Sequence, residues 1–191
     1  MRDLYDIHCH ILPGVDDGAK TMADTRQMLK MAYDQGIREI IATPHYLFGE
    51  DLPSAGELRK ILSQVQEEAK AIDPGFLIHC GNEVLYFEGM TEELKAGKIL
   101  TLGDSRYVLT EFYDNASFHE IYQAVRKVVM AGYRMVVAHV ERYFCLRESG
   151  RLENLIQAGA VLQMNYKSLE GGSAQIPAGF HQRPVDLFRT G

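Results

Sequence analysis

The sequence has few cysteines, no long apolar run and no excess of basic residues. Its three cysteines, Cys9, Cys80 and Cys145, are too scattered for a disulfide framework, and no pair has the CxxC spacing of a redox or zinc motif. No stretch approaches the roughly 20 apolar residues of a transmembrane helix, and the N-terminus lacks the apolar core of a signal peptide. We therefore expect a protein of the reducing cytoplasm that has no membrane span.

Basic residues are outnumbered, with 20 Lys and Arg against 26 Asp and Glu and a formal net charge of −6 at pH 7. Without a basic surplus, an extended nucleic-acid-binding surface is not expected. The chain has 191 residues, of which 46% are hydrophobic and 24% are charged. This length can bury a core of its own, and no linker or repeat divides it. We predict a single domain that spans residues 1–191.

Short apolar segments alternate along the chain with segments of helical periodicity. Thr21 and Asp24 have the spacing of a helix-capping pair, and Gly36 is suited to end the same helix. We expect strands at residues 5–10, 37–42, 76–80, 107–110, 135–138 and 160–164. We expect helices at residues 21–36, 54–72, 118–132 and 152–159. This alternation is typical of an α/β fold with a parallel sheet or barrel.

Residues that bind metal ions stand at or just after the ends of five successive predicted strands. The C-terminal ends of parallel strands converge on one face of the fold. Strand residues two apart point the same way, so His8 and His10 can face a common centre. Asp17, in the loop after the first strand, can reach the same place. The predicted metal ligands are His8, His10, Asp17, His45, Glu83, Glu111 and His139.

This set of imidazoles and carboxylates contains no thiolate, which favours Mn, Fe, Co or Zn over a closed structural zinc site. Seven ligands exceed the need of one ion, so we predict two or three divalent ions with bridging carboxylates. Such ions bind phosphate oxygens and activate water at neutral pH. Arg142, three residues after His139, is predicted to bind phosphate through its planar guanidinium. The alternative for Arg142 is an ion pair with Glu141.

The segments around these residues resemble the polymerase-and-histidinol-phosphatase (PHP) superfamily, and within it the bacterial CpsB/CapC-type manganese-dependent protein-tyrosine phosphatases. The matching stretches are residues 6–18, 41–45, 81–83, 107–112, 139–143 and 163–169. The resemblance implies a PHP-type distorted (β/α) TIM-like barrel, here with about six strand–helix units. It also implies a three-metal Mn²⁺ site that uses the seven ligands, with Glu83 bridging and Arg142 on the phosphate. The implied substrate is phosphotyrosine on a bacterial tyrosine kinase that regulates capsule or exopolysaccharide synthesis.

Two features depart from the family pattern. Val140 stands where members usually have proline, a change that removes no ligand. The family's late Asp-x-His element, in which both residues bind metal, has no counterpart after Ser168, because Asp186 is not followed by a suitable histidine and His181 lacks an Asp partner. We therefore expect the closing strand or strands of the barrel to be missing and the activity to be impaired.

The sequence is compatible with three functions. The first is a metal-dependent phosphatase that acts on phosphotyrosine in proteins. The second is another PHP-type phosphomonoesterase, acting on histidinol phosphate or a sugar phosphate, because the ligands recognise only the phosphate. The third is a truncated, weakly active chain that serves as a regulatory or binding module. Metal stoichiometry together with turnover of phosphotyrosine separates them.

Overall fold

The structure, a computed structural model, describes residues 4–165. The chain divides into two compact units, Met1–Asp104 and Ser105–Gly191, which are called the N-terminal unit and the C-terminal unit below. The single domain predicted over residues 1–191 stays a prediction. The predicted lack of a closing strand, together with Asp186 and His181, concerns residues outside the described part of the chain.

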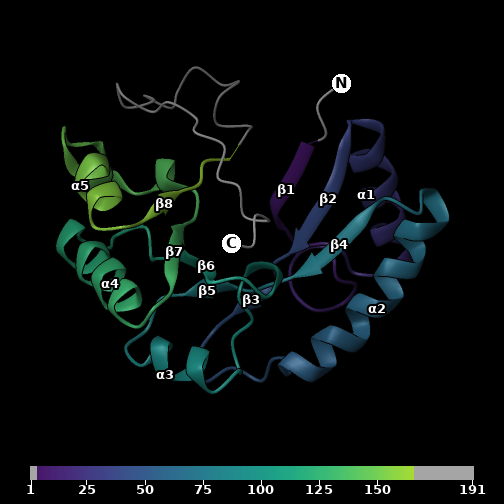
Figure 1. Cartoon of the computed structure of the whole chain (residues 1–191), viewed down its shortest axis with the longest axis horizontal. Coiled ribbons are helices and arrows are strands. Elements are labelled where there is room, and N and C mark those ends of the chain that lie inside the picture. Colours follow the sequence, from purple (N-terminus) through teal and green to yellow (C-terminus); the bar gives the residue numbers. More distant parts are fainter. Residues whose placement is uncertain (1–3, 166–191) are drawn as a thin grey trace. The chain divides into compact units, whose positions relative to one another are not determined.

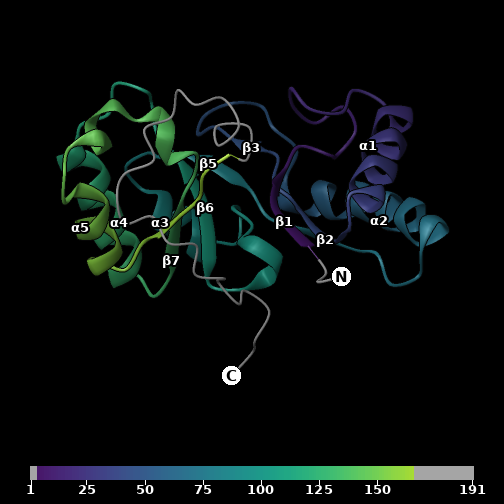
Figure 2. The same ribbon diagram turned by 90° about the horizontal axis from the view of Figure 1, so that it is seen from above.

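The N-terminal unit holds a parallel sheet in the order β1-β2-β4 and a parallel pair of short strands, β3 and β5. The strands are β1 (Leu4–Cys9), β2 (Ile37–Ala42), β3 (His45–Tyr46), β4 (Leu77–Cys80) and β5 (Glu83–Leu85). The helices are α1 (Met22–Asp34), α2 (Ala55–Ile72) and α3 (Met90–Lys95), and a 3₁₀ turn follows at Leu102–Asp104. Figures 1 and 2 show α1 and α2 side by side along one face of the β1-β2-β4 sheet.

The core of this unit lies between that sheet face and the two helices. Alternate residues of β2, Ile40 and Ala42, join a buried apolar cluster with Leu29 of α1 and Val65 of α2. This follows from the two-residue period of a strand and the apolar stripe of an amphipathic helix.

Both long helices of the unit begin at capping boxes. The Thr21 side chain accepts the Asp24 N–H, and the Asp24 carboxylate accepts the Thr21 N–H. Ser54 and Glu57 form the same reciprocal pair at the start of α2. Each box satisfies backbone donors that the first turn of a helix leaves without partners. The helix start predicted at Thr21 is confirmed.

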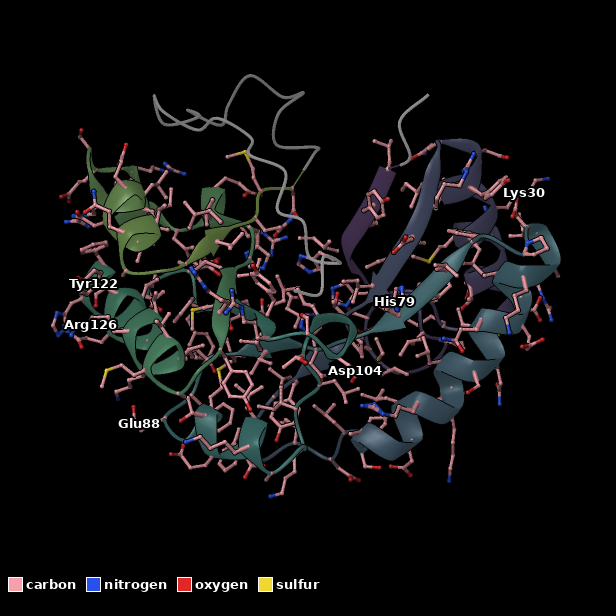
Figure 3. All side chains as sticks on the ribbon, in the orientation of Figure 1. Lys30, His79, Glu88, Asp104, Tyr122 and Arg126 are labelled. Carbon is pink, nitrogen blue, oxygen red and sulfur yellow. The ribbon has the colours of Figure 1, made fainter. Side chains whose placement is uncertain are left out.

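The C-terminal unit holds a second parallel sheet in the order β6-β7-β8. Its strands are β6 (Tyr107–Glu111), β7 (Arg134–Val137) and β8 (Val161–Leu162), its helices are α4 (Phe118–Met130) and α5 (Arg151–Gln157), and its 3₁₀ turns are η2 (Val140–Arg142) and η3 (Phe144–Arg147). Ile121, Val125 and Val128 of α4 are fully buried. Tyr122 and Arg126 project from the face of α4 that points away from the strands (Figure 3).

The α/β class with parallel sheets is confirmed, and each predicted strand and helix is present. The elements β3, β5 and α3 were not predicted, because segments of two, three and six residues are too short to show a period. Within residues 4–165, no helix combines the length and the apolar character needed to cross a bilayer.

Candidate metal centre

Three predicted ligands of the N-terminal unit meet at one carboxylate oxygen. Oε2 of Glu83 lies 3.0 Å from Nε2 of His8 and 3.1 Å from Nε2 of His10. The two Nε2 atoms are 3.3 Å apart. The Glu83 side chain is only 2% exposed, so its carboxylate is buried, and imidazoles of His8 and His10 contact it. A buried carboxylate is costly without such partners.

The spacing of these donor atoms fits a divalent metal ion. Donors bound at about 2.1 Å to one ion lie roughly 3.0–3.4 Å apart in octahedral or tetrahedral coordination. The three distances among His8, His10 and Glu83 fall within this range. Two imidazoles and one carboxylate are also the donors that Mn, Fe, Co and Zn accept. The residues therefore fit the predicted metal.

A second group contains Asp17 and His45. Nε2 of His45 lies 3.6 Å from Oδ1 of Asp17, and Nδ1 of His45 lies 3.4 Å from Oε2 of Glu83. One donor atom each from His10, Asp17 and His45 lie within 4.8 Å of one another. The Asp17 side chain is 82% exposed, so this part of the cluster faces solvent. The N-terminal unit thus brings together all five of the ligands predicted within it.

The loop after β1 places its aspartates because it folds tightly back on His10. The Ala19 N–H donates to the carbonyl of His10, and the Gly14 N–H donates to the carbonyl of Ala19. A Cβ on Gly18 would lie 2.0 Å from the carbonyl oxygen of His10. Glycine at position 18 is therefore a steric requirement of the loop.

Asn82 fixes the bend between β4 and β5 that presents Glu83. Its buried side chain donates to the carbonyl of Pro44 and accepts the Leu100 N–H, at 3.2 and 2.8 Å. The Glu83 N–H donates to the same Pro44 carbonyl at 3.1 Å. As a result, β3 and β5 pair in register with His45 opposite Glu83. The Gly81-Asn82-Glu83 segment thus positions the predicted ligand Glu83.

Asp16 lies beside the ligands, with a side chain that is 6% exposed. Its Oδ2 is 2.6 Å from Nδ1 of His10, and its Oδ1 accepts the Gly18 N–H at 3.0 Å. Burial alone would raise the pKa of Asp16, but the hydrogen bonds from His10 and Gly18 hold that pKa below its ordinary value.

The same contacts change the protonation of His10. Burial alone would lower the pKa of this imidazole, but Asp16 and Glu83 outweigh it and raise the pKa to about 10. Without metal, His10 is therefore protonated at neutral pH. A metal ion could bind this ring only by displacing a proton, so the metal affinity of such a site would rise with pH.

The C-terminal unit brings together the remaining two predicted ligands. Glu111 is the last residue of β6, and His139 follows two residues after the end of β7. Nε2 of His139 lies 3.4 Å from Oε2 of Glu111. His139 is 3% exposed and Glu111 is 16% exposed, so the pair is largely shielded from water.

His139 has an uncommon backbone conformation. Its φ of 34° and ψ of 54° lie in the left-handed region, which costs a non-glycine residue about 1 kcal/mol or more. Two hydrogen bonds to Gln163 offset this conformational cost. Oε1 of Gln163 accepts the His139 N–H at 2.7 Å, and its carbonyl accepts the Val140 N–H at 3.0 Å. The chain thereby turns sharply at the ligand as it leaves β7.

Tyr143 holds the other side of the His139 ring. Its Oη lies 3.4 Å from Nδ1 of His139 and accepts the Phe112 N–H at 2.9 Å. Tyr143 is fully buried, so both contacts are made away from solvent. Phe112 directly follows Glu111, and the hydroxyl therefore links the segments that carry the two predicted ligands of this unit.

Arg142 is exposed in the 3₁₀ turn that follows His139, and its backbone N–H donates to the His139 carbonyl at 2.9 Å. The alternative, an ion pair with Glu141, is absent from the part of the chain that the structure describes. Oε1 of Glu141 instead accepts the Asn165 N–H at 3.3 Å.

Sequence reasoning assigned no role to four residues that shape these clusters: Asp16, Asn82, Tyr143 and Gln163. Asp16 directly precedes a predicted ligand and Tyr143 follows one by four residues. Neither spacing indicates whether a side chain binds metal or supports a ligand. Gln163 lies 24 residues from His139, and nothing in the sequence links the two.

Comparison with known proteins identifies relatives over most of the chain. The family model described as "Capsular polysaccharide synthesis, CpsB/CapC" matches residues 4–183. Tyrosine-protein phosphatase CpsB of Streptococcus pneumoniae is 35% identical over 163 residues, which are 85% of this chain and 67% of the relative. Tyrosine-protein phosphatase YwqE of Bacillus subtilis is 34% identical over 169 residues, which are 88% of this chain and 66% of the relative.

The fold has a counterpart among solved structures. A crystal structure from work on B. subtilis YwqE and S. pneumoniae CpsB, described as unique metal-dependent tyrosine phosphatases, matches with a TM-score of 0.80 and 34% identity. The match covers 88% of this chain and 68% of that one. This chain therefore spans about two thirds of the length of the relatives it matches. By the extent of the family match and by these identities, the chain belongs to the CpsB/CapC family.

Proposed function

We propose that the chain is a divalent-metal-dependent phosphatase that hydrolyses phosphotyrosine in proteins. The proposed substrate is a bacterial tyrosine kinase that regulates capsule or exopolysaccharide synthesis. The main support is Oε2 of Glu83, which lies within 3.4 Å of imidazole nitrogens from His8, His10 and His45. Mn²⁺ is the proposed ion, with Fe, Co or Zn as alternatives. The proposed ligands are His8, His10, Asp17, His45, Glu83, Glu111 and His139.

Bound divalent ions would supply binding of phosphoryl oxygens and a water of lowered pKa. Glu83 offers a carboxylate that is already desolvated and surrounded by ligands, so little rearrangement is needed when an ion binds. Asp17 faces solvent, where a phosphoprotein can approach. Arg142 can hold two phosphoryl oxygens through its planar guanidinium and so orient the phosphoryl group.

The acidity of the leaving hydroxyl favours an aryl phosphate over an alkyl phosphate as the substrate. A tyrosyl hydroxyl ionises with a pKa of about 10, far below that of an alkyl alcohol. Tyrosinate therefore needs less help from a general acid, and we assign no residue to that role. Histidinol phosphate and sugar phosphates release alkyl alcohols, whose departure depends more strongly on protonation or on metal stabilisation of the leaving oxygen.

A substrate panel tests the proposal. Initial rates on a phosphotyrosine peptide, a phosphoserine peptide, histidinol phosphate and a sugar phosphate are compared at equal concentration with Mn²⁺. We expect the phosphotyrosine peptide to be hydrolysed fastest. A higher rate on histidinol phosphate or the sugar phosphate would instead identify another phosphomonoesterase. Tight metal binding with no turnover of any ester would indicate a regulatory or binding module.

The distorted (β/α) barrel of about six strand–helix units is the fold we propose. Its support is the parallel order of the strands within each unit and the likeness to the solved relative. A cytoplasmic location is also part of the proposal. It is supported by Cys9, Cys80 and Cys145, which are all free thiols.

A further inference from the structure

Asp16 lies closer to the His10 ring than its neighbour Asp17 does, although Asp17 is the proposed ligand. Oδ2 of Asp16 lies 2.6 Å from Nδ1 of His10, which is the shortest contact of that ring. The Asp16 side chain is 6% exposed, whereas that of Asp17 is 82% exposed. A carboxylate so enclosed and so close to a ligand ring must influence how that ring is used.

The two nitrogens of His10 face different partners. Nδ1 faces Asp16, while Nε2 faces His8 and Glu83 at 3.3 and 3.1 Å. A carboxylate only accepts hydrogen bonds, and a neutral imidazole has one donor nitrogen and one acceptor nitrogen. The Asp16 contact therefore places the proton of the neutral ring on Nδ1 and leaves the Nε2 lone pair for a metal ion.

We infer that Asp16 is a positioning residue that holds Nδ1–H of His10, so that Nε2 is the nitrogen that binds the ion shared with His8 and Glu83. This inference rests on the metal site of the proposed function. Carboxylate–imidazole–metal arrangements of this kind fix the orientation of the ring and increase its basicity as a ligand.

This role for Asp16 also assigns His10 to one of the two donor groups that share it, His8–His10–Glu83 and His10–Asp17–His45. The 4.0 Å approach of His10 to Asp17 is made by Nδ1, the nitrogen that Asp16 occupies. His10 therefore binds one ion with His8 and Glu83. Asp17 and His45, whose donor atoms are 3.6 Å apart, are left to serve a second ion.

Asp16 acts on the second group through the backbone. Its Oδ2 accepts the His45 N–H at 3.2 Å, and its Oδ1 accepts the Gly18 N–H at 3.0 Å. One carboxylate thus joins the loop that carries Asp17 to the start of β3, where His45 lies. Loss of this carboxylate should weaken both groups of donors.

The test uses the full chain loaded with Zn²⁺, a diamagnetic ion suited to NMR. Zn²⁺ affinity is measured by competition with a chromophoric chelator for the wild type, Asp16→Ala and Asp16→Asn. Asp16→Asn keeps the volume and one acceptor oxygen, so it remains informative if Asp16→Ala does not fold. Asp104→Asn is the matched control, because Asp104 is exposed in the same unit, pairs with Arg59, and has the left-handed φ of 57° that asparagine tolerates (Figure 3).

We expect Asp16→Ala to lower Zn²⁺ affinity by about 10–100-fold, Asp16→Asn to lower it less, and Asp104→Asn to leave it unchanged. In the Zn²⁺-loaded wild type, ¹⁵N NMR should show the His10 ring bound through Nε2, with a slowly exchanging proton on Nδ1. That proton should exchange faster in Asp16→Asn at unchanged thermal stability, an effect that a merely structural role would not produce.

Binding through Nδ1, wild-type affinity in folded Asp16 variants, or no binding of Zn²⁺ by the wild type would each overturn the inference. The readouts are separate from turnover. A chain that shows them all and hydrolyses no phosphotyrosine would refute the proposed function and leave the role of Asp16 intact.

Discussion

His45 and Glu83 stand directly opposite each other in the parallel strands β3 and β5, with Nδ1 of His45 3.4 Å from Oε2 of Glu83. The same oxygen lies within 3.1 Å of both His8 and His10. Glu83 therefore connects the two donor groups of the N-terminal unit through a single oxygen, and its side chain is only 2% exposed.

Replacing Glu83 with glutamine should abolish most of the activity. The amide keeps the size of the side chain but replaces an anionic oxygen with a donor group that faces imidazole nitrogens. We expect Mn²⁺ affinity and phosphotyrosine turnover to fall by more than about 100-fold, beyond the range for residues that only support ligands. Glu88→Gln, an exposed position in the same unit, is the control (Figure 3). Equal Mn²⁺ affinity and turnover in the two variants would show that Glu83 does not belong to the metal site.

Metal removal and thiol modification should have opposite effects. Burial raises the pKa of the Cys9 thiol, and burial also raises the pKa of Cys80 to about 11, so neither is a reactive thiolate at neutral pH. We expect EDTA to abolish turnover, Mn²⁺ to restore it, and iodoacetamide to leave it unchanged. Inactivation by iodoacetamide with resistance to EDTA would contradict the metal-dependent reaction and point to a cysteine nucleophile.

Substitution of Gly18 with alanine should disrupt the loop that carries Asp16 and Asp17. The new Cβ would lie 2.0 Å from the His10 carbonyl oxygen and 2.4 Å from the His10 Cβ, so the loop must move. We expect a loss of about 1–3 kcal/mol in the free energy of unfolding and a lower Mn²⁺ affinity. Gly56→Ala, in α2 with its nearest atom 4.0 Å away, should be neutral or stabilising. A wild-type melting temperature for Gly18→Ala would show that the loop relaxes freely.

Tyr143→Phe tests the support of His139. Removal of the hydroxyl leaves the buried Phe112 N–H without this acceptor, which costs about 1–3 kcal/mol. The same change frees the His139 ring, so we expect lower turnover as well as lower stability in urea. Tyr122→Phe is the matched control, since Tyr122 lies on the outward face of α4 (Figure 3). Full activity together with reduced stability would restrict Tyr143 to a structural role.

The protonation of His10 predicts a pH dependence for the metal-free protein. Its pKa is raised from 6.5 to about 10 by Asp16 and Glu83, despite the opposing effect of burial. Protonation therefore favours the folded state. The contribution of His10 to the free energy of unfolding is complete below about pH 6.5 and is lost as the pH rises through about 10.

Urea unfolding after EDTA treatment, between pH 6 and pH 10.5, measures this effect. The stability difference between the wild type and His10→Gln should shrink as the pH rises. A wild-type advantage that grows with pH would show that the His10 ring is neutral in the folded chain.

The elements of the fold were largely readable from the sequence. Capping residues such as Thr21, apolar periods in the long helices, and short apolar runs located the strands and helices to within a few residues. These signals are local, because each depends on neighbouring residues along one helix or strand. The short strands β3 and β5 carry no such signal, since their pairing depends on a bend fixed by Asn82.

The amino-acid order shows which residue types stand at the strand ends, and therefore that imidazoles and carboxylates, without thiolates, are available for metal. Tertiary structure decided how they are used. The folded chain places Glu83 against three imidazoles and brings the Asp16 carboxylate to Nδ1 of His10. It also brings Gln163 to the backbone N–H of His139 and Tyr143 to the His139 ring. These contacts depend on loop closure and strand register, which bring together side chains 4 to 75 positions apart in geometries that sequence spacing does not specify.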